Sequence, residues 1–276
     1  MPPPGYLDRI VAAHRARAES DRRDPEALLA RAEDQGPTRG FSDHIADSTA
    51  LAVVAEIKRR SPSKGDIDLA LDPADVARRY AEGGATCLSV LTDEEHFGGS
   101  PADLVSAREA CEVPVLRKDF TVSVADVCDA RSMGADALLL IAAVLSDDEL
   151  SALHTLAIEL SMDPLVEVHD ERELDRALEL GAALIGVNQR DLTTFEVDTS
   201  RAARLAGLIP PEVVAVAESG IGSPEDAHAL AEVGYQAVLV GESLLRAPDR
   251  AGAVSAMCGF EIGHREASGV PGRVRG

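Results

Sequence analysis

The sequence contains very little lysine. Only three of its 27 basic residues are lysines, namely Lys58, Lys64 and Lys118, and all the others are arginines. Acidic residues number 48, so the formal net charge is −21. This surplus argues against a nucleic-acid or anionic-membrane partner, because phosphate contacts need clustered cations. Three lysines left at random by a compositional bias would explain the count, but each one calls for a local reason.

Low aromatic content, few cysteines and the absence of long apolar runs exclude further classes of protein and of binding site. Aromatic residues make up 3% of the chain and tryptophan is absent, so a binding site must rely mainly on charged groups. The four cysteines form no Cys-x-x-Cys pair and show no metal-ligand spacing with the histidines, which predicts reduced thiols and no metal. The longest apolar run, 137–145, is far shorter than the roughly 20 residues that span a bilayer. The N-terminus does not resemble a signal peptide, so we expect a cytoplasmic protein.

From residue 51 onward, short apolar runs alternate with amphipathic segments of helical length. Strands separated by helices pair in parallel through crossovers. Eight such units favour a (β/α)8 TIM barrel over an open doubly wound sheet, which is the alternative. No Gly-x-Gly-x-x-Gly follows the first run, so the usual dinucleotide motif is absent. The eight strand-like runs are 52–57, 86–91, 114–117, 136–141, 164–168, 183–187, 212–217 and 236–240.

The length of 276 residues suits one such barrel, since α/β barrels run to about 250 residues as a single domain. Residues 6–35 show helical spacing of apolar side chains, and Pro25 stands where a first helical turn begins. We therefore predict an N-terminal helical extension over 1–50, packed on a barrel over 51–258. The Gly- and Arg-rich segment 259–276 is predicted to be a flexible tail.

Polar residues recur at the C-terminal ends of the predicted strands, where barrels of this type carry out chemistry. Each one alone is equally compatible with a surface charge or a paired core charge, but charges in apolar strands are costly unless paired. Two lysines and three carboxylates meeting at one mouth suit proton transfer on an anionic substrate. The strand-end residues are Glu56, Lys58, Lys118, Glu167, Asn188, Arg190, Glu218 and Ser219.

A phosphate site is also indicated. Loops after the seventh and eighth strands of such barrels commonly bind phosphate through backbone N–H groups and a helix N-terminus. Here Gly220-Ile221-Gly222-Ser223 follows the seventh run and Gly241-Glu242-Ser243 follows the eighth. The loop Ser61-Pro62-Ser63-Lys64-Gly65 after the first run is predicted to close over the substrate.

Several motifs together resemble indole-3-glycerol phosphate synthase, in the order and spacing of that family from about Val53 to Leu245. The resemblance implies closure of the indole ring of 1-(2-carboxyphenylamino)-1-deoxyribulose 5-phosphate with loss of CO2 and water, in tryptophan biosynthesis. It implies a reaction without cofactor or metal. It also implies a monomer that acts on a small phosphorylated molecule. The motifs are Glu56-Ile57-Lys58-Arg59-Arg60-Ser61-Pro62-Ser63-Lys64-Gly65, Phe97-Gly98-Gly99-Ser100, Leu116-Arg117-Lys118-Asp119-Phe120, Leu165-Val166-Glu167-Val168-His169, Gly186-Val187-Asn188-Gln189-Arg190 and Ala217-Glu218-Ser219-Gly220-Ile221.

The resemblance also implies roles for residues. Lys118 is the general acid at the ketone oxygen, Glu167 the general base, and Lys58, oriented by Glu56, binds an anionic group and acts in the dehydration. A buried ammonium can be tuned to donate a proton near neutral pH, whereas a guanidinium cannot. Further substrate contacts fall to Ser61, Phe97, Phe120, Asn188, Arg190, Glu218 and Ser219, and phosphate contacts to Lys58, Gly220, Gly241 and Glu242.

Two alternative functions remain, and one residue departs from the pattern of the family. A phosphoribosylanthranilate isomerase-like enzyme would need an acid–base pair such as Cys and Asp, and no cysteine ends the first strand. A non-catalytic anion-binding barrel would predict loss of a strand-end polar residue. Glu242 stands where other members of the family have serine, and since its carboxylate would repel a phosphate, we expect only its backbone N–H to contribute.

Overall fold

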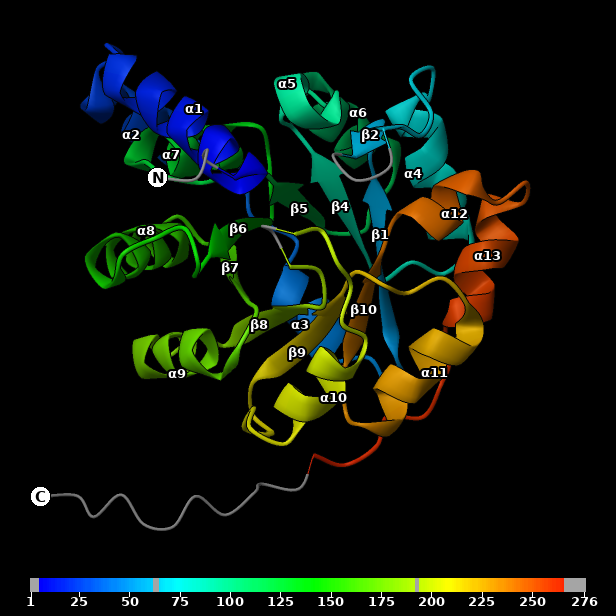
Figure 1. Cartoon of the computed structure of the whole chain (residues 1–276). Coiled ribbons are helices and arrows are strands. Elements are labelled where there is room, and N and C mark those ends of the chain that lie inside the picture. The colour runs from blue at the N-terminus through cyan, green and yellow to red at the C-terminus, as the bar shows by residue number, and fades with distance from the viewer. Residues whose placement is uncertain (1–4, 62–64, 192–193, 266–276) are drawn as a thin grey trace, which may run out of the picture.

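Eight parallel strands close into a barrel surrounded by helices in the computed structural model (Figure 1), which describes residues 5–61, 65–191 and 194–265. Each strand pairs with the next barrel strand in the chain, and β10 pairs with β1 to complete the circle. The TIM-barrel prediction is confirmed, and the open sheet is excluded. The barrel strands are β1 (Ala52–Ile57), β4 (Cys87–Leu91), β5 (Val115–Lys118), β6 (Ala137–Ile141), β7 (Asp163–Val168), β8 (Leu184–Asn188), β9 (Val214–Glu218) and β10 (Ala237–Val240).

The helices begin where the sequence supplies capping residues. Side-chain oxygens of Ser or Asp accept hydrogen bonds from the first-turn backbone N–H groups of nine of the described helices, which satisfies donors that a helix start leaves open. The helices are α1 (Tyr6–Ser20), α2 (Pro25–Glu33), α3 (Phe41–Ala46), α4 (Pro73–Glu82), α5 (Glu94–Phe97), α6 (Pro101–Ala110), α7 (Val124–Ser132), α8 (Asp147–Glu159), α9 (Glu171–Leu180), α10 (Ser200–Ala206), α11 (Pro224–Glu232), α12 (Glu242–Arg246) and α13 (Arg250–Met257).

The strands bury two separate apolar layers because successive side chains point to opposite faces. One layer lies between the strands and the outer helices and includes Val53, Leu88 and Val166. The other fills the barrel interior, with members such as Val54, Leu116, Leu139, Leu165, Val216 and Leu239.

The N-terminal extension touches both ends of the barrel. The short helix α3 places Phe41 and Ile45, both fully buried, in the interior layer beside the first residues of several strands. Cys87 Sγ of β4 lies 3.7 Å from the Phe41 carbonyl oxygen, so α3 closes the N-terminal end. Helix α1 lies at the opposite end, beside the loops that follow the strands (Figure 1).

Several details differ from the sequence expectations or add to them. Strands β5 and β9 run one residue further, to Lys118 and Glu218. The loop after β1 contains a small hairpin of β2 (Arg60–Ser61) and β3 (Gly65–Asp66). Lys64 lies outside the described residues.

Residues 259–265 of the predicted tail lie against the barrel. The Arg265 guanidinium donates to the carbonyl oxygens of Pro211 and Val213, and the Phe260 carbonyl accepts from Leu51 N–H. These bonds anchor the segment near the strand starts, a packing that its Gly- and Arg-rich composition does not predict. No helix within the described ranges is long and apolar enough to cross a membrane.

Candidate active site

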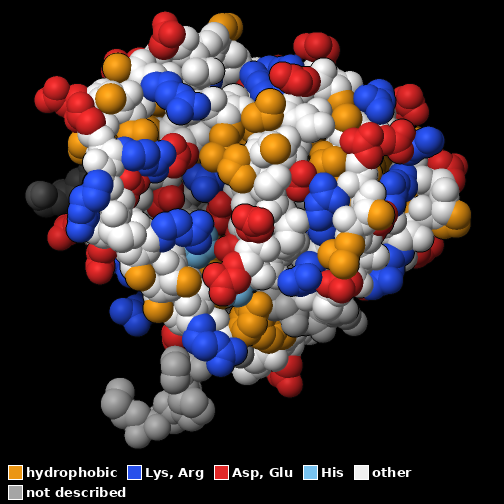
Figure 2. All heavy atoms as spheres, turned by 90° about the horizontal axis from the view of Figure 1, so that it is seen from above, with side chains coloured by type: hydrophobic (Ala, Val, Ile, Leu, Met, Phe, Trp, Pro, Cys, Tyr) orange, Lys and Arg blue, Asp and Glu red, His pale blue; other side chains and the backbone are white. Residues whose placement is uncertain are grey.

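A cavity of about 470 Å³ opens at the C-terminal end of the barrel. Seen from this end, basic and acidic side chains lie next to each other around a hollow in the surface (Figure 2). All of the sequence-predicted site residues line this one cavity, although they come from seven of the barrel strands or the loops after them. They are Glu56, Lys58, Ser61, Phe97, Lys118, Phe120, Glu167, Asn188, Arg190, Glu218, Ser219, Gly220, Gly241 and Glu242.

The strand period explains how charged groups reach the cavity. Residues two apart on a strand share a face, so a side chain two positions after an interior apolar residue also points inward but lies one layer higher. Glu56 follows Val54 in this way, Lys118 follows Leu116, Glu167 follows Leu165, and Glu218 follows Val216. The barrel interior is therefore apolar below and charged at the mouth.

Lys58 and Glu56 form a short ion pair at the end of β1, with Glu56 almost completely buried. Burial opposes the charge of Glu56, but the nearby Lys58 and Lys118 ammonium groups outweigh it and lower its pKa. Gly241 makes room for this carboxylate, since a Cβ there would lie 2.5 Å from Glu56 Oε1. The ion pair therefore keeps the Lys58 ammonium at the mouth, and the same ammonium compensates the buried Glu56 carboxylate.

Lys118 of β5 stands between two carboxylates, one from β7 and one from β9 on the opposite side of the barrel. Its Nζ lies 3.4 Å from Glu167 Oε2 and 3.2 Å from Glu218 Oε2. Burial works against its charge, but the attraction of Glu218, Glu167 and Glu56 is stronger and raises its pKa. The carboxylates thus oppose the downward tuning that the sequence analysis expected of a buried ammonium. Lys118 is a firmly held cation in the free cavity.

Glu218 has a different protonation behaviour from the other carboxylates. Burial raises its pKa to about 7, with Lys118 opposing the shift and Glu167 adding to it. Its side chain occupies the space left by Gly186 on β8, where a Cβ would overlap Oε1. Neither carboxylate oxygen of Glu218 has a hydrogen bond of good geometry within the described parts of the chain, and Lys118 Nζ lies 3.2 Å from Oε2. Of Glu56, Glu167 and Glu218, only Glu218 has a raised pKa.

His169 does not line the cavity but contacts Glu167, which does, and it was not predicted from the sequence. Its Nε2 lies 3.3 Å from Glu167 Oε1 and its Nδ1 lies 2.9 Å from Glu173 Oε2. Burial lowers the pKa of the ring, but the two carboxylates outweigh burial and raise it to about 10. Burial likewise opposes the charge of Glu167, yet Lys118 and His169 lower its pKa. The signal was available, since His169 follows Leu165 and Glu167 in phase.

The opposite side of the cavity has the features of a phosphate site. Ser219 and Gly220 both adopt left-handed φ angles, 65° and 74°, directly after β9. A positive φ is uncommon for serine and marks a functional turn when it is maintained. Ser243 Oγ donates to the Ile221 carbonyl at 3.2 Å, which ties the loop after β9 to the start of α12.

Glu242 does not stand alone beside this phosphate site. Its Oε1 accepts from Arg246 Nε at 3.0 Å, one helical turn later, and Arg246 also lines the cavity. Arg246 was not predicted as a site residue, although its i+4 spacing from Glu242 was a usable signal. The ion pair offsets the charge that made Glu242 unexpected at this position.

Aromatic and polar residues complete the wall. Phe97, Phe120 and Phe195 line the cavity, and Phe195 was not predicted. The Arg190 backbone N–H donates to Asn188 Oδ1 at 3.0 Å, and the Arg190 guanidinium donates to the Phe195 carbonyl at 3.0 Å. These bonds fix the loop after β8 against the cavity.

Comparisons with known proteins agree with this geometry. The family model for indole-3-glycerol phosphate synthase matches residues 7–257. The chain is 49% identical over 260 residues to an indole-3-glycerol phosphate synthase of a Nocardioides species, covering 92% of this chain and 98% of the relative. It is also 50% identical over 223 residues to indole-3-glycerol phosphate synthase 2 of Streptomyces coelicolor, covering 81% and 86%. The isomerase-like alternative has no such support.

A solved structure supports the fold alone. Thiamine phosphate pyrophosphorylase from Pyrococcus furiosus superposes with a TM-score of 0.56 at 16% identity, covering 75% of this chain and 93% of that one. Two findings are far more specific than this structural likeness. The family model matches the barrel from its first strand to its last, and the relatives are about half identical to this chain. This chain therefore belongs to the indole-3-glycerol phosphate synthase family.

Proposed function

We propose that the cavity closes the indole ring of 1-(2-carboxyphenylamino)-1-deoxyribulose 5-phosphate with loss of CO2 and water. The observation that carries the proposal is the position of Lys118, an inward-pointing cation paired with Glu167 and Glu218 above an otherwise apolar barrel interior. Ring closure needs a proton at the ketone oxygen and groups that move protons nearby. The cavity supplies both.

Lys118 acts as the general acid. When the ring carbon attacks the ketone carbon, negative charge develops on the ketone oxygen, and an alkoxide is a much stronger base than any carboxylate around Lys118. The ammonium therefore gives its proton to this oxygen even though Glu218, Glu167 and Glu56 raise the lysine pKa. A donor held in place before the reaction stabilises the transition state more than the ground state.

Glu167 and Glu218 divide the remaining proton transfers on this side. The pKa of Glu167 is lowered by Lys118 and His169, which leaves an ionised carboxylate that serves as general base. Glu218, with a pKa of about 7, takes up or returns a proton near neutral pH. Two carboxylates whose environments push their pKa values apart are a recurrent arrangement for acid–base catalysis.

Lys58 and Glu56 serve the anionic end of the substrate and the dehydration. Lys58 binds an anionic group, Glu56 orients it through their ion pair, and the loops that contain Gly220 and Gly241 bind the phosphate with Lys58 and the Glu242 N–H. Ser61, Phe97, Phe120, Asn188, Arg190 and Ser219 contact the rest of the substrate, with the two phenyl rings against the anthranilate ring.

The direct test is an assay of the purified chain with 1-(2-carboxyphenylamino)-1-deoxyribulose 5-phosphate, following indoleglycerol phosphate and CO2. We expect one CO2 for each indole formed. Lys118→Ala should lose at least about 10³-fold in kcat. Lys118→Arg should lose nearly as much, because the larger planar guanidinium cannot place a donor where Nζ lies between Glu167 and Glu218. Full activity in the arginine variant would show that Lys118 acts only by charge.

We also propose a monomer in the cytoplasm that uses no cofactor. All four cysteines are unpaired thiols, as a reducing compartment permits. Size-exclusion chromatography with light scattering tests the monomer, and turnover after exhaustive treatment with a chelator tests the absence of a metal requirement. A non-catalytic barrel would bind the substrate without releasing CO2.

A further inference from the structure

Helix α1 contacts four of the loops that surround the cavity mouth. Near its start, the Tyr6 ring lies edge-on to His96 after β4 and to Phe195 after β8, at centroid distances of 5.9 and 5.4 Å. Further along, the Arg15 guanidinium donates to Glu149 and to the Val144 carbonyl after β6. The helix therefore joins elements that are far apart in sequence.

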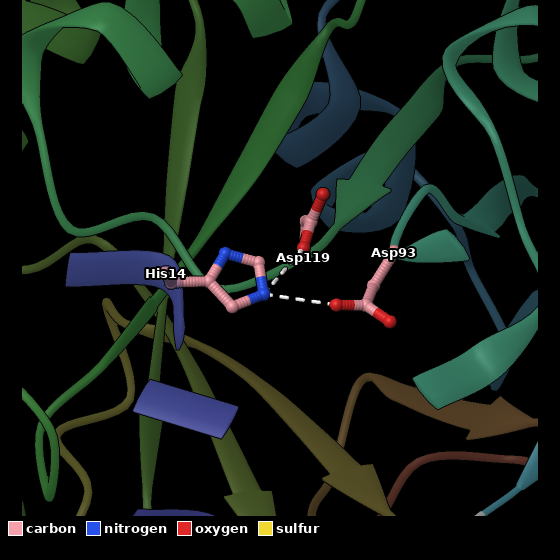
Figure 3. Close-up of side chains that lie close together, drawn as sticks. All are labelled: His14, Asp93 and Asp119. Atoms are coloured by element: carbon pink, nitrogen blue, oxygen red, sulfur yellow. Dashed lines mark hydrogen bonds and ion pairs between the residues drawn. The ribbon is translucent and has the colours of Figure 1, made fainter. Parts of the chain in front are cut away.

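The centre of this contact is His14, which is only 4% exposed. Figure 3 shows its ring pointing toward two carboxylates, one after β4 and one after β5. His14 Nε2 lies 2.9 Å from Asp93 Oδ2 and 3.8 Å from Asp119 Oδ1. Both carboxylates are buried, and because Asp119 is also paired with Arg117, the loss of His14 would fall mainly on Asp93.

These three side chains form a junction in which His14 is hydrogen-bonded to Asp93 and lies close to Asp119 without a hydrogen bond. Asp93 Oδ1 accepts from the backbone N–H groups of His96 and Phe97, and Oδ2 accepts from the two imidazoles. Asp119 Oδ1 accepts from Phe120 N–H, while Oδ2 accepts from Thr92 and Arg117. Each carboxylate oxygen already has a donor, so the arrangement is complete without a metal ion.

Both aspartates hold aromatic residues of the cavity wall. Asp93 caps α5, the one-turn helix that carries Phe97. Asp119 binds the backbone of Phe120, whose ring centroid lies 5.3 Å from that of His14. The junction therefore connects α1 directly to the two rings that face the proposed anthranilate site.

We propose that His14 is a positioning residue for substrate binding. By joining Asp93 to Asp119, it fixes the distance between Phe97 and Phe120 and thereby the width of the aromatic slot. The proposal rests on the proposed function, in which these rings contact the anthranilate part of the substrate. His14 acts through the two aspartates and does not itself line the cavity.

The effect should fall on KM rather than on kcat. Lys118 precedes Asp119 but is held on β5, which pairs with β4 and β6. Its ion-pair partners Glu167 and Glu218 lie on β7 and β9, which the neighbouring barrel strands hold in place. Widening the aromatic slot weakens substrate and transition state alike, which raises KM and leaves kcat unchanged.

Four variants test this. The amide of glutamine reaches about as far as Nε2 and donates to Asp93, whereas the amide of asparagine does not reach. We expect His14→Ala and His14→Asn to raise KM about tenfold with kcat within about twofold, and His14→Gln to stay within about threefold of wild-type KM. Arg15→Ala is the matched control, because it removes a contact of the same helix to Glu149 outside the cavity.

The outcomes separate positioning from simple stability. Melting temperatures of all variants are measured, and kinetics are run well below the lowest one. Equal KM values for His14→Asn and His14→Gln, or an Arg15→Ala KM as high as that of His14→Ala, overturn the proposal. An inactive wild-type chain overturns the proposed function and this inference with it. An active wild type with wild-type KM in every His14 variant overturns this inference alone.

Discussion

The same strands build the lower and the upper half of the barrel interior, but the lower half is apolar and the upper half is charged. On β7, Leu165 points inward into the apolar layer, and Glu167, two residues later, points inward into the cavity. Below, burial of apolar area stabilises the fold. Above, buried carboxylates and ammonium groups must compensate one another, and the residual imbalance appears as shifted pKa values. Strand position, rather than burial, separates structural from chemical residues here.

Among the changes in the charged upper half of the interior, replacing Glu167 by glutamine should cause the largest loss of activity. The amide keeps the shape but removes the base and the negative charge that faces Lys118 and His169. We expect kcat to fall about 10³-fold while KM changes less than about threefold, because the group acts in proton transfer. Steady-state kinetics at neutral pH measure both. A change confined to KM would make Glu167 a positioning group.

Replacing Leu165 by alanine should produce the reverse pattern. The side chain is completely buried in the interior layer, and its removal leaves a cavity that the barrel cannot easily collapse. The free energy of unfolding should fall by about 2–5 kcal/mol, with kcat within about threefold of wild type. Chemical denaturation of both β7 variants gives the comparison. A large loss of kcat at full substrate saturation would show that the two layers are not separate.

Features of the apolar lower half and the charged upper half that depend on residues close in sequence could be predicted, whereas those that depend on distant residues could not. The eight strands and the inward phase of Glu56, Lys118, Glu167 and Glu218 follow from a period of two, which is a local property. The convergence of these residues follows from the barrel rule that parallel strands end at one face. The structure brings the predicted residues into one cavity, and their roles stay predictions.

Long-range contacts were not predictable in the same way. His14 meets Asp93 across 79 positions of sequence, and nothing near His14 distinguishes it from any apolar-face histidine. The pKa of Glu218 depends on its burial, which raises it, on Lys118, which lowers it, and on Glu167 and Glu56, which raise it, and these three residues lie on other strands. The packed segment 259–265 likewise depends on where its carbonyl partners lie. In each case the deciding group belongs to another element.

The pH dependence of stability sharpens the comparison further. Because the folded protein holds the Glu218 proton up to a pKa of about 7, against a usual value of 4.5, the folded state binds more protons than the unfolded one between these pH values. Stability is then lost as pH rises through this window, by at most about 3 kcal/mol. Glu218→Gln should reduce this slope between pH 4.5 and pH 7, whereas Leu165→Ala should leave the slope unchanged. Above pH 6.5 the slope keeps a contribution from His169, whose pKa is raised from 6.5 to about 10. Denaturation at several pH values measures both, and an unaltered slope in the glutamine variant contradicts the assignment of the proton to Glu218.

The smallest expected effect lies at the phosphate side of the upper half. Glu242 pairs with Arg246, and both line the cavity. Because both side chains are partly exposed, their interaction is weakened by solvent and worth less than about 1 kcal/mol. Glu242→Ser should therefore lower KM by only about two- to threefold, by removing a negative charge near the phosphate and freeing Arg246 to contact it. Arg246→Ala should raise KM, and the double variant should resemble Arg246→Ala if Glu242 acts through its partner. An increase in KM in Glu242→Ser would instead mean that the carboxylate keeps Arg246 in its binding position, so the pair would belong to the compensated charges of the upper half.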